Sequence, residues 1–260
     1  MKVAAIQMDS LWENPSANLI KARQIVLSTD AELLVFPEMF ATGFSMNPQR
    51  IAQKMAGEVV TRMTELAIES GKALIFSAAI EDAHSTAPNE SHFYNRLFFI
   101  APDGTRLVYD KRHLFRMANE QEFYAAGQNR LVIHYKDFRI CPMVCYDLRF
   151  PVWSRQKGDY DLLIYIASWP EVRSYAWTTL LRARAIENQC YLMGVNRVGN
   201  DPKNLYSGDS VVVNFLGQPL VEATPSTEQV VSVELSLQEL EQFRAGFPAS
   251  MDADKFTIEQ

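Results

Sequence analysis

The stretch Leu33-Leu34-Val35-Phe36-Pro37-Glu38 decides the fold: four apolar residues run into a proline and then an acid. A short apolar run bounded by turn residues is typical of a strand that is buried on both faces of a sheet. Upstream, residues 2–8 form a second apolar run, and Asn14 with Pro15 supplies the N-cap and first position of a helix between the two. The chain therefore opens with a strand, a helix and a strand, which indicates an α/β protein.

Helical patterns recur further along the chain. One helix is predicted over residues 58–70, with Gly71 as its stop, and another over residues 174–189. The last helix begins at Ser236, which forms a capping box with Glu239. The helix over 174–189 is expected to turn one apolar stripe toward the core, made of Trp177, Leu180, Leu181 and Ile186.

Strand patterns outnumber the helices. Beyond the first two strands, they cover residues 73–79, 93–101, 107–109, 131–135, 138–144, 162–166, 191–196, 211–215, 219–221 and 230–235. Pro102-Asp103-Gly104 reads as a hairpin turn, so some strands must pair antiparallel. So many strands exceed one doubly wound sheet, and we expect two stacked sheets with helices outside them.

Length and charge restrict the classes of function. The 260 residues favour one domain over residues 1–250, followed by a polar tail over 251–260 that we expect to form an arm. The formal charge of −6 and the lack of any basic run give no support for binding nucleic acid or an anionic membrane. The apolar N-terminus breaks at Gln7 and Asp9, too early for a signal peptide or a membrane span, so we expect a cytoplasmic protein.

Cysteine and histidine usage argues against a metal site. The odd count of Cys141, Cys145 and Cys190 suits reduced thiols better than a disulfide framework. Cys141 and Cys145 are four residues apart, but two further ligands at matching spacing are missing. The four histidines, at positions 84, 92, 113 and 134, have no metal-ligand spacing. We therefore expect no metal and no cofactor.

Three reactive residues share one position, just beyond the end of an apolar strand. They are Glu38, Lys111 and Cys145. Ligands bind at the carboxyl ends of strands in open α/β sheets, so these side chains are expected to converge there. Taken singly, each has a structural alternative: a solvated loop carboxylate, a surface pair of Lys111 with Asp110, or an inert buried thiol.

The motifs around these residues resemble those of the nitrilase superfamily of carbon–nitrogen hydrolases. The motifs that carry the resemblance are Phe36-Pro37-Glu38, Asp110 to Phe115, Val144 to Pro151, Arg182 to Gln189, Gly208-Asp209-Ser210 and Phe215-Leu216-Gly217. The resemblance implies a four-layer αββα sandwich, a homodimer and a small-molecule amide substrate.

A finer resemblance points to one branch of that superfamily. The stretches from Lys111 to Gly127 and from Trp169 to Trp177 look most like omega-amidases, which hydrolyse the terminal amide of 2-oxoglutaramate or 2-oxosuccinamate. Two residues depart from the usual pattern. Pro142 removes a ladder donor within the strand before Cys145 and suggests an irregular or edge position, and Val152 stands where an acid is common.

The resemblance assigns a role to each of the three residues. A free thiol is only a few per cent thiolate at pH 7, so Cys145 needs Glu38 as a base. Glu38 would then return the proton to departing ammonia, while Lys111 and the backbone N–H of Tyr146 hold the oxyanion. A papain-type alternative uses His113, which on a strand would face the same side as Lys111, but it leaves Glu38 without a part.

The resemblance also extends to supporting residues. Counting back seven residues from Gly127 places a second glutamate at Glu120 rather than Glu122, with a role in positioning substrate and Lys111; a solvated loop acid is the alternative. Asp147 and Arg149 would either form a salt bridge that supports the nucleophile turn or contact the substrate carboxylate.

The far carboxylate of a 2-oxo acid amide needs a cation. The residues predicted to bind substrate are Arg116, Arg149, Trp169 and Arg173. A nitrilase and an N-carbamoyl hydrolase would use the same three catalytic residues, so both activities remain as alternative predictions. A non-catalytic binding protein that retains the fold is the alternative of another class.

Overall fold

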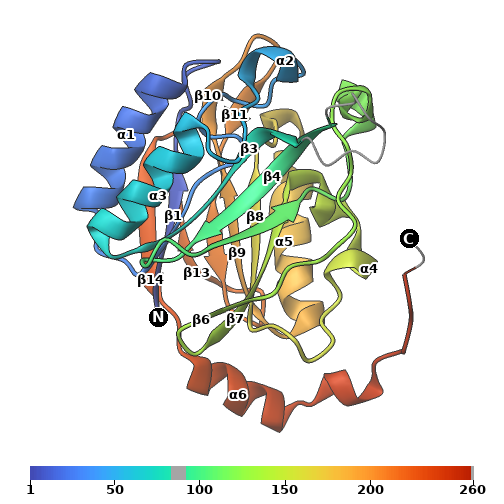
Figure 1. Ribbon diagram of the computed structural model, residues 1–260. Helices are drawn as coiled ribbons and strands as arrows, with labels where there is room; N and C mark the ends of the chain where they lie inside the picture. The colour runs from blue at the N-terminus through green and yellow to red at the C-terminus, as the bar shows by residue number, and fades with distance from the viewer. Residues whose placement is uncertain (83–91, 259–260) are drawn as a thin grey trace.

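The computed structural model describes residues 1–82 and 92–258, and two six-stranded mixed sheets dominate it (Figure 1). In spatial order the first sheet consists of β14 (Gln229–Glu234), β1 (Lys2–Gln7), β2 (Leu33–Val35), β3 (Ala73–Asp82), β4 (His92–Ile100) and β5 (Arg106–Asp110). The second consists of β13 (Pro219–Glu222), β12 (Val211–Val213), β9 (Tyr191–Asn196), β8 (Leu162–Ala167), β7 (Phe138–Val144) and β6 (Ile133–Tyr135). A separate two-stranded ribbon pairs β10 (Val198–Asn200) with β11 (Leu205–Ser207). His84 lies outside the described residues, as do the last two residues of the tail.

Helices lie around the sheets. The α-helices are α1 (Pro15–Ser28), α2 (Pro48–Ile51), α3 (Glu58–Ser70), α4 (Pro151–Ser154), α5 (Ser174–Asn188) and α6 (Leu237–Gly246). Short 3-10 turns are η1 (Arg116–Ala118), η2 (Glu120–Glu122), η3 (Cys145–Arg149), η4 (Glu171–Arg173) and η5 (Ala249–Asp252). Within residues 1–82 and 92–258, no helix combines the length and apolarity that crossing a membrane requires.

The layers follow from the alternation of side chains along each strand. In β1, Val3 and Ala5 pack into a core shared with the second sheet, whereas Ala4 and Ile6 pack into a second core with α1 and α3. On the other side of the molecule, α5 packs against β9. The order helix, sheet, sheet, helix confirms the predicted αββα sandwich.

Most predicted elements are present, with ends shifted by up to three residues, as in β3, which runs to Asp82 and not to residue 79. The predicted helix over 58–70 matches α3, and Gly71 caps it in the left-handed conformation. The predicted strand over 211–215 stops at Val213, since Asn214 begins the turn to β13. Sequence periodicity missed α2, α4, β10 and β11, which have only three or four residues each.

The predicted core stripe of α5 was wrong at one position. Trp177 and Leu181 are fully buried and Leu180 packs partly against the core, but Ile186 is 53% exposed. Ile186 follows Trp177 by nine residues, which at about 3.6 residues per turn places it on the opposite face of the helix. The stripe continues instead through Ala185 and Asn188.

Pro142 does not disturb its strand. The register of β7 with β8 runs without a shift from Ile140, opposite Leu162, to Val144, opposite Ile166. The backbone N–H of Asp161, the residue before β8, donates to the carbonyl of Arg139, so the backbone groups of Arg139 face β8. Because the backbone groups of successive residues in a strand point to alternate sides, the nitrogen of Pro142, three residues further on, points away from β8. On that side β6 pairs only as far as Ile140. The proline therefore sits where no ladder donor is needed, a local edge as expected.

The predicted arm lies back on the body as far as the structure describes it. The Lys157 amine stands 4.6 Å from the centre of the Phe256 ring, and Ile258 packs against the main core.

The two faces of α5 give a test of the packing. Leu181→Ala should lower the free energy of unfolding by about 2 to 5 kcal/mol, because it leaves a cavity in the core. Ile186→Ala, on the opposite face, should cost less than about 1 kcal/mol. Urea unfolding at one fixed protein concentration measures both, and similar losses for the two variants would contradict this account of the helix.

Candidate active site

Three turns at the carboxyl ends of strands bring Glu38, Lys111 and Cys145 together, as the sequence predicted. Glu38 follows β2 and Lys111 follows β5 in the first sheet, while Cys145 follows β7 in the second. The Lys111 Nζ lies 3.0 Å from the Glu38 Oε1, and both side chains are fully buried. The site is thus formed where the ends of the two stacked sheets meet.

Glu38 is held by three donors. Its Oε1 accepts hydrogen bonds from Asn95 Nδ2 at 2.7 Å and from Lys111 Nζ at 3.0 Å, and its Oε2 accepts one from the Ser168 backbone N–H at 2.9 Å. All three partners donate, so both oxygens of Glu38 act as hydrogen-bond acceptors. Ser168 follows β8, so both sheets fix the orientation of this one side chain.

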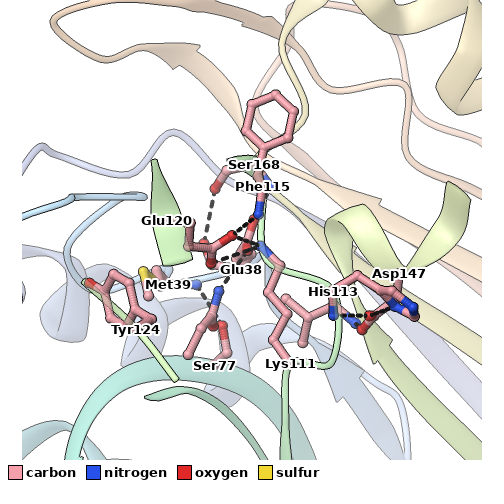
Figure 2. Close-up of polar contacts among 12 residues, drawn as sticks. Glu38, Met39, Ser77, Lys111, His113, Phe115, Glu120, Tyr124, Asp147 and Ser168 are labelled. Carbon is pink, nitrogen blue, oxygen red and sulfur yellow. Dashed lines mark hydrogen bonds and ion pairs between the residues drawn. The ribbon is translucent and has the colours of Figure 1, made fainter. Parts of the chain in front are cut away.

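Lys111 is a buried cation between two carboxylates (Figure 2). Besides Glu38, its Nζ donates to both oxygens of Glu120, at 2.9 and 3.0 Å, and it stands 4.8 Å from the centre of the Phe44 ring. Burial lowers the pKa of Lys111, but the charges of Glu120 and Glu38 together outweigh burial and raise it overall. The ammonium form is therefore the stable one.

The second glutamate is Glu120, as predicted, and not Glu122. Glu120 is fully buried, so the alternative of a solvated loop acid was wrong. Its Oε2 also accepts a hydrogen bond from the Phe115 N–H at 2.6 Å. Burial raises the pKa of Glu120, and the Lys111 charge opposes that rise.

The loop that carries Glu120 closes on itself at Lys111. The Gly127 N–H donates to the Lys111 carbonyl at 2.9 Å. A Cβ at position 127 would lie 2.1 Å from the Asp110 carbonyl oxygen, so only glycine allows this close approach.

Cys145 stands at a strained turn. Its φ of +47° is in the left-handed region, which costs a non-glycine residue roughly 1 to 3 kcal/mol. Burial and, after it, the Glu38 carboxylate raise the pKa of the Cys145 thiol well above its usual range, although Lys111 and the Ser168 N–H oppose the rise. The resting thiol is therefore protonated near neutral pH. Burial also raises the pKa of Cys141, to about 12.

A cavity of about 310 Å³ opens onto Cys145 and Lys111. This volume suits a small molecule. The remaining residues that line it are Trp12, Phe44, Met46, Phe115, Met117, Ala118, Tyr146, Arg149, Ser168, Trp169, Pro170, Arg173, Asp201, Pro202, Lys203, Asn204 and Tyr206. Of the predicted substrate-binding residues, Arg149, Trp169 and Arg173 are among them, but Arg116 is not, so that part of the prediction was wrong.

The two arginines of the wall lie against aromatic rings. The Arg149 guanidinium is 5.0 Å from the centre of a Trp169 ring, and the Arg173 guanidinium is 5.3 Å from that of Phe115. Within residues 1–82 and 92–258, neither arginine forms an ion pair. The wall thus offers two cations without a carboxylate partner. Sequence reasoning missed a third, Lys203, at the tip of the β10–β11 ribbon.

Of the two alternatives for Asp147 and Arg149, a salt bridge between them was wrong. Asp147 accepts hydrogen bonds from Tyr109, His113 and Val144 instead, and no oxygen of its carboxylate is left for Arg149. Asp147 is fully buried, so it makes no contact with a substrate carboxylate either.

The expectation that His113 faces the same side as Lys111 was also wrong. Strand β5 ends at Asp110, so the alternation of a strand does not reach His113. The His113 ring stacks on Phe150 at 3.9 Å and its Nδ1 contacts Asp147, away from the Lys111 amine (Figure 2). A papain-type Cys–His pair has no support in this geometry.

Sequence reasoning also missed Asn95 and Ser168, which orient Glu38. One signal was available for Asn95, a polar residue in the middle of an apolar predicted strand. Nothing in the chain marks Ser168, since it acts through its backbone N–H across the two sheets.

Comparisons with known proteins identify the family of this chain. The family model for carbon–nitrogen hydrolases matches residues 2–245. Omega-amidase YafV of Yersinia enterocolitica is 42% identical over 260 residues, covering 99% of this chain and 98% of that protein. The 2-oxoglutaramate amidase of Bacillus subtilis is 29% identical over 260 residues, covering 97% of each chain.

A solved structure agrees as well. XC1258 from Xanthomonas campestris, a CN-hydrolase superfamily protein with an arsenic adduct in its active site, superimposes with a TM-score of 0.93 at 41% identity, covering 100% of this chain and 99% of that one. The family match over nearly the whole chain, the 42% identity to an omega-amidase and the shared fold lead to one conclusion: the chain belongs to the carbon–nitrogen hydrolase family, and it is an amidase.

Proposed function

We propose that this amidase hydrolyses the terminal carboxamide of a short 2-oxo acid monoamide, 2-oxoglutaramate or 2-oxosuccinamate, through a thioester on Cys145. One observation carries the proposal. Cys145 lines the same cavity as the amine of Lys111, beside Glu38, and the wall of that cavity holds arginines without carboxylate partners.

Acylation begins with the protonated thiol. The Cys145 Sγ attacks the amide carbon while its proton passes to Glu38. The Glu38 carboxylate is close enough to raise the pKa of this thiol in the resting enzyme. The carbonyl oxygen becomes negatively charged, and the Lys111 ammonium, together with the Tyr146 N–H, stabilises it. The C–N bond then breaks, Glu38 gives its proton to the nitrogen, and ammonia leaves.

Deacylation uses the same carboxylate. Glu38 takes a proton from a water molecule, the resulting hydroxide attacks the thioester carbon, and the C–S bond breaks. The thiolate recovers a proton from Glu38, so the enzyme returns to its starting state and the product is a carboxylic acid.

The arginines of the wall provide selectivity for acids. A 2-oxo acid amide carries a carboxylate at the end opposite to the scissile amide, and planar guanidinium groups pair with carboxylates through two hydrogen bonds. The guanidinium groups of Arg149 and Arg173 each lie over an aromatic ring, which stabilises a cation at these positions. We assign the principal contact to Arg173, which comes from η4 at the cavity wall.

The relatives support this substrate class. Two of them are named for omega-amidase and 2-oxoglutaramate amidase activity, at 42% and 29% identity. A nitrilase or an N-carbamoyl hydrolase would need Glu38, Lys111 and Cys145 together with a different pocket. The substrate panel below separates these activities.

We also propose a cytoplasmic homodimer with one hydrolase domain over residues 1–250 and a tail over 251–260. Three unpaired cysteines suit a reducing compartment. Val172 and Tyr175, near the start of α5, are exposed apolar side chains that a second copy would cover. Both sheets share one core, which supports a single domain.

Cys145→Ala should fold normally and lose essentially all turnover, because no thioester can form. Mass spectrometry of wild-type enzyme quenched during turnover should find an acyl adduct on Cys145. Cys141 lies in the same tryptic peptide, residues 140–149, so fragment ions between the two positions must locate the adduct. An adduct on Cys141 or Cys190, both fully buried, would disprove the assignment.

Glu38→Gln should reduce kcat/KM by about a hundred- to ten-thousand-fold near pH 7, since the protonated thiol loses its base. The thiol pKa is raised, so the thiolate fraction grows about tenfold per pH unit below that pKa. The residual rate of this variant should therefore increase from pH 6 to 8.5. A pH–rate profile measures this, and a flat profile for the variant would contradict the role of Glu38.

Arg173→Leu should lower kcat/KM for 2-oxoglutaramate by about 10- to 100-fold, the equivalent of a lost charge-assisted pair of about 1.5 to 3 kcal/mol. The rate on uncharged propionamide should change little. Arg116→Leu, which lies outside the cavity lining, is the matched control.

The full panel for these two variants and the wild type is 2-oxoglutaramate, 2-oxosuccinamate, glutamine, propionamide, a nitrile and an N-carbamoyl amino acid. Equal wild-type rates on charged and uncharged amides would reduce the proposal to a general aliphatic amidase. Preferential turnover of the nitrile or the N-carbamoyl compound would replace it.

A further inference from the structure

Asp147 is a buried carboxylate that the reaction itself does not use. It lies two residues after Cys145 in η3 and is fully shielded from solvent. Its Oδ2 accepts hydrogen bonds from the Val144 N–H at 3.0 Å and the Tyr109 hydroxyl at 2.7 Å. Its Oδ1 accepts from the N–H of His113 at 3.0 Å and from the ring Nδ1 of His113 at 2.8 Å.

These four hydrogen bonds connect the two turns that carry the reactive groups. Val144 immediately precedes Cys145, whereas Tyr109 and His113 stand on either side of Lys111. Val144 belongs to β7 of the second sheet, Tyr109 belongs to β5 of the first sheet, and His113 lies in the loop after β5. One side chain thus ties the nucleophile to the lysine across the interface between the sheets.

The edge of β7 shows why a side chain is needed there. Strand β6 pairs only as far as Ile140, Pro142 has no N–H, and Val144 is the next residue whose N–H points away from β8. The Asp147 carboxylate satisfies that N–H in place of a neighbouring strand. The same hydrogen bond holds the chain at the point where Cys145 adopts its strained positive φ.

The chemistry of the position requires a carboxylate. All four partners donate, counting the His113 Nδ1 as protonated, and an ionised carboxylate is an acceptor only. An asparagine of the same shape would present an NH₂ group to two of the four donors. Those two hydrogen bonds would be lost, and the donors would be left unpaired in a buried site.

We propose that Asp147 is a positioning residue that sets the distance between the Cys145 thiol and the Lys111 ammonium by clamping their two turns together. It touches neither group and acts through Val144, Tyr109 and His113. The inference rests on the proposed function, in which Cys145 attacks while Lys111 stabilises the oxyanion.

Asp161 provides a matched control for the loss of a buried carboxylate. It too is nearly fully buried, and it accepts hydrogen bonds from the Arg139 backbone and side chain and from Arg244. It lies immediately before β8, at the end of that strand opposite to the site. Asp161→Asn therefore removes a comparable buried charge without touching the two turns.

The experiment compares wild type, Asp147→Asn, Asp161→Asn and His113→Phe in three measurements: Tm, steady-state kinetics on 2-oxoglutaramate, and the rate of Cys145 alkylation by iodoacetamide. Asp147→Asn should lower kcat by about 10- to 100-fold with KM within about threefold, since a misplacement of about 1 Å can cost a factor of a hundred. Its alkylation should also slow by about tenfold or more, because the thiol moves away from the Lys111 ammonium, whose charge lowers the thiol pKa. Asp161→Asn should lower Tm but leave kcat and the alkylation rate within about threefold of wild type.

His113→Phe keeps the ring stacked on Phe150 and keeps its backbone N–H, so it removes one of the four hydrogen bonds. It should lower kcat by about three- to tenfold at unchanged KM. If Asp147→Asn does not fold, an unchanged kcat in His113→Phe overturns the proposal. A wild-type kcat in folded Asp147→Asn, or equal losses in Asp147→Asn and Asp161→Asn, overturns it as well.

Failure of the proposed function gives a different result. Wild-type enzyme would then not turn over 2-oxoglutaramate, but the alkylation rates of the four proteins would still report whether Asp147 controls Cys145.

Discussion

The site depends on one buried positive charge, the Lys111 ammonium. Moving an ammonium from water into a protein interior costs several kcal/mol even after relaxation, and only well-placed partners offset that cost. Here the partners are Glu38 and Glu120, both buried and both within 3.0 Å of the Nζ. Each glutamate accepts hydrogen bonds from the ammonium that the other does not replace, so the three groups must be assembled as a unit.

This cluster of Glu38, Lys111 and Glu120 is contributed by one sheet, and the other sheet adds the nucleophile. The first sheet and its loops hold Glu38, Lys111 and Glu120 together before any nucleophile is considered. The second sheet adds Cys145 and the Ser168 N–H, which donates to Glu38. Because the parallel strands of each sheet end at this side of the sandwich, the stacking of the sheets is enough to bring the base next to the thiol.

The sequence predicted which reactive residues follow directly after a strand. It did not predict the contacts between residues of different strands. Glu38, Lys111 and Cys145 stood out because each directly follows an apolar run, and the family resemblance gave them their roles. The same resemblance, with the count back from Gly127, pointed to Glu120. Arg116 was predicted for the cavity but points to solvent, because chain proximity to Lys111 does not fix the direction of a side chain.

The four layers follow from strand and helix patterns together with the family resemblance, but their fine packing does not. Ile186 is apolar yet faces outward, since one exposed apolar residue has little cost. The partners of Asp147 could not be read from the chain either. Tyr109 and His113 meet this carboxylate through the stacking of two sheets, which no local pattern encodes.

The protonation state of the resting site suits the cleavage of an amide. A preformed thiolate would attack readily, but the nitrogen of an amide leaves only when it receives a proton. Burial and the nearby Glu38 raise the pKa of the Cys145 thiol, so the free enzyme holds that proton on sulfur, next to an acceptor carboxylate. In the proposed mechanism, attack transfers the proton to Glu38, and the same proton then serves the departing ammonia. In that mechanism Lys111 has two roles: its ammonium donates a hydrogen bond that orients Glu38 beside the thiol, and it supplies the cation that the oxyanion requires.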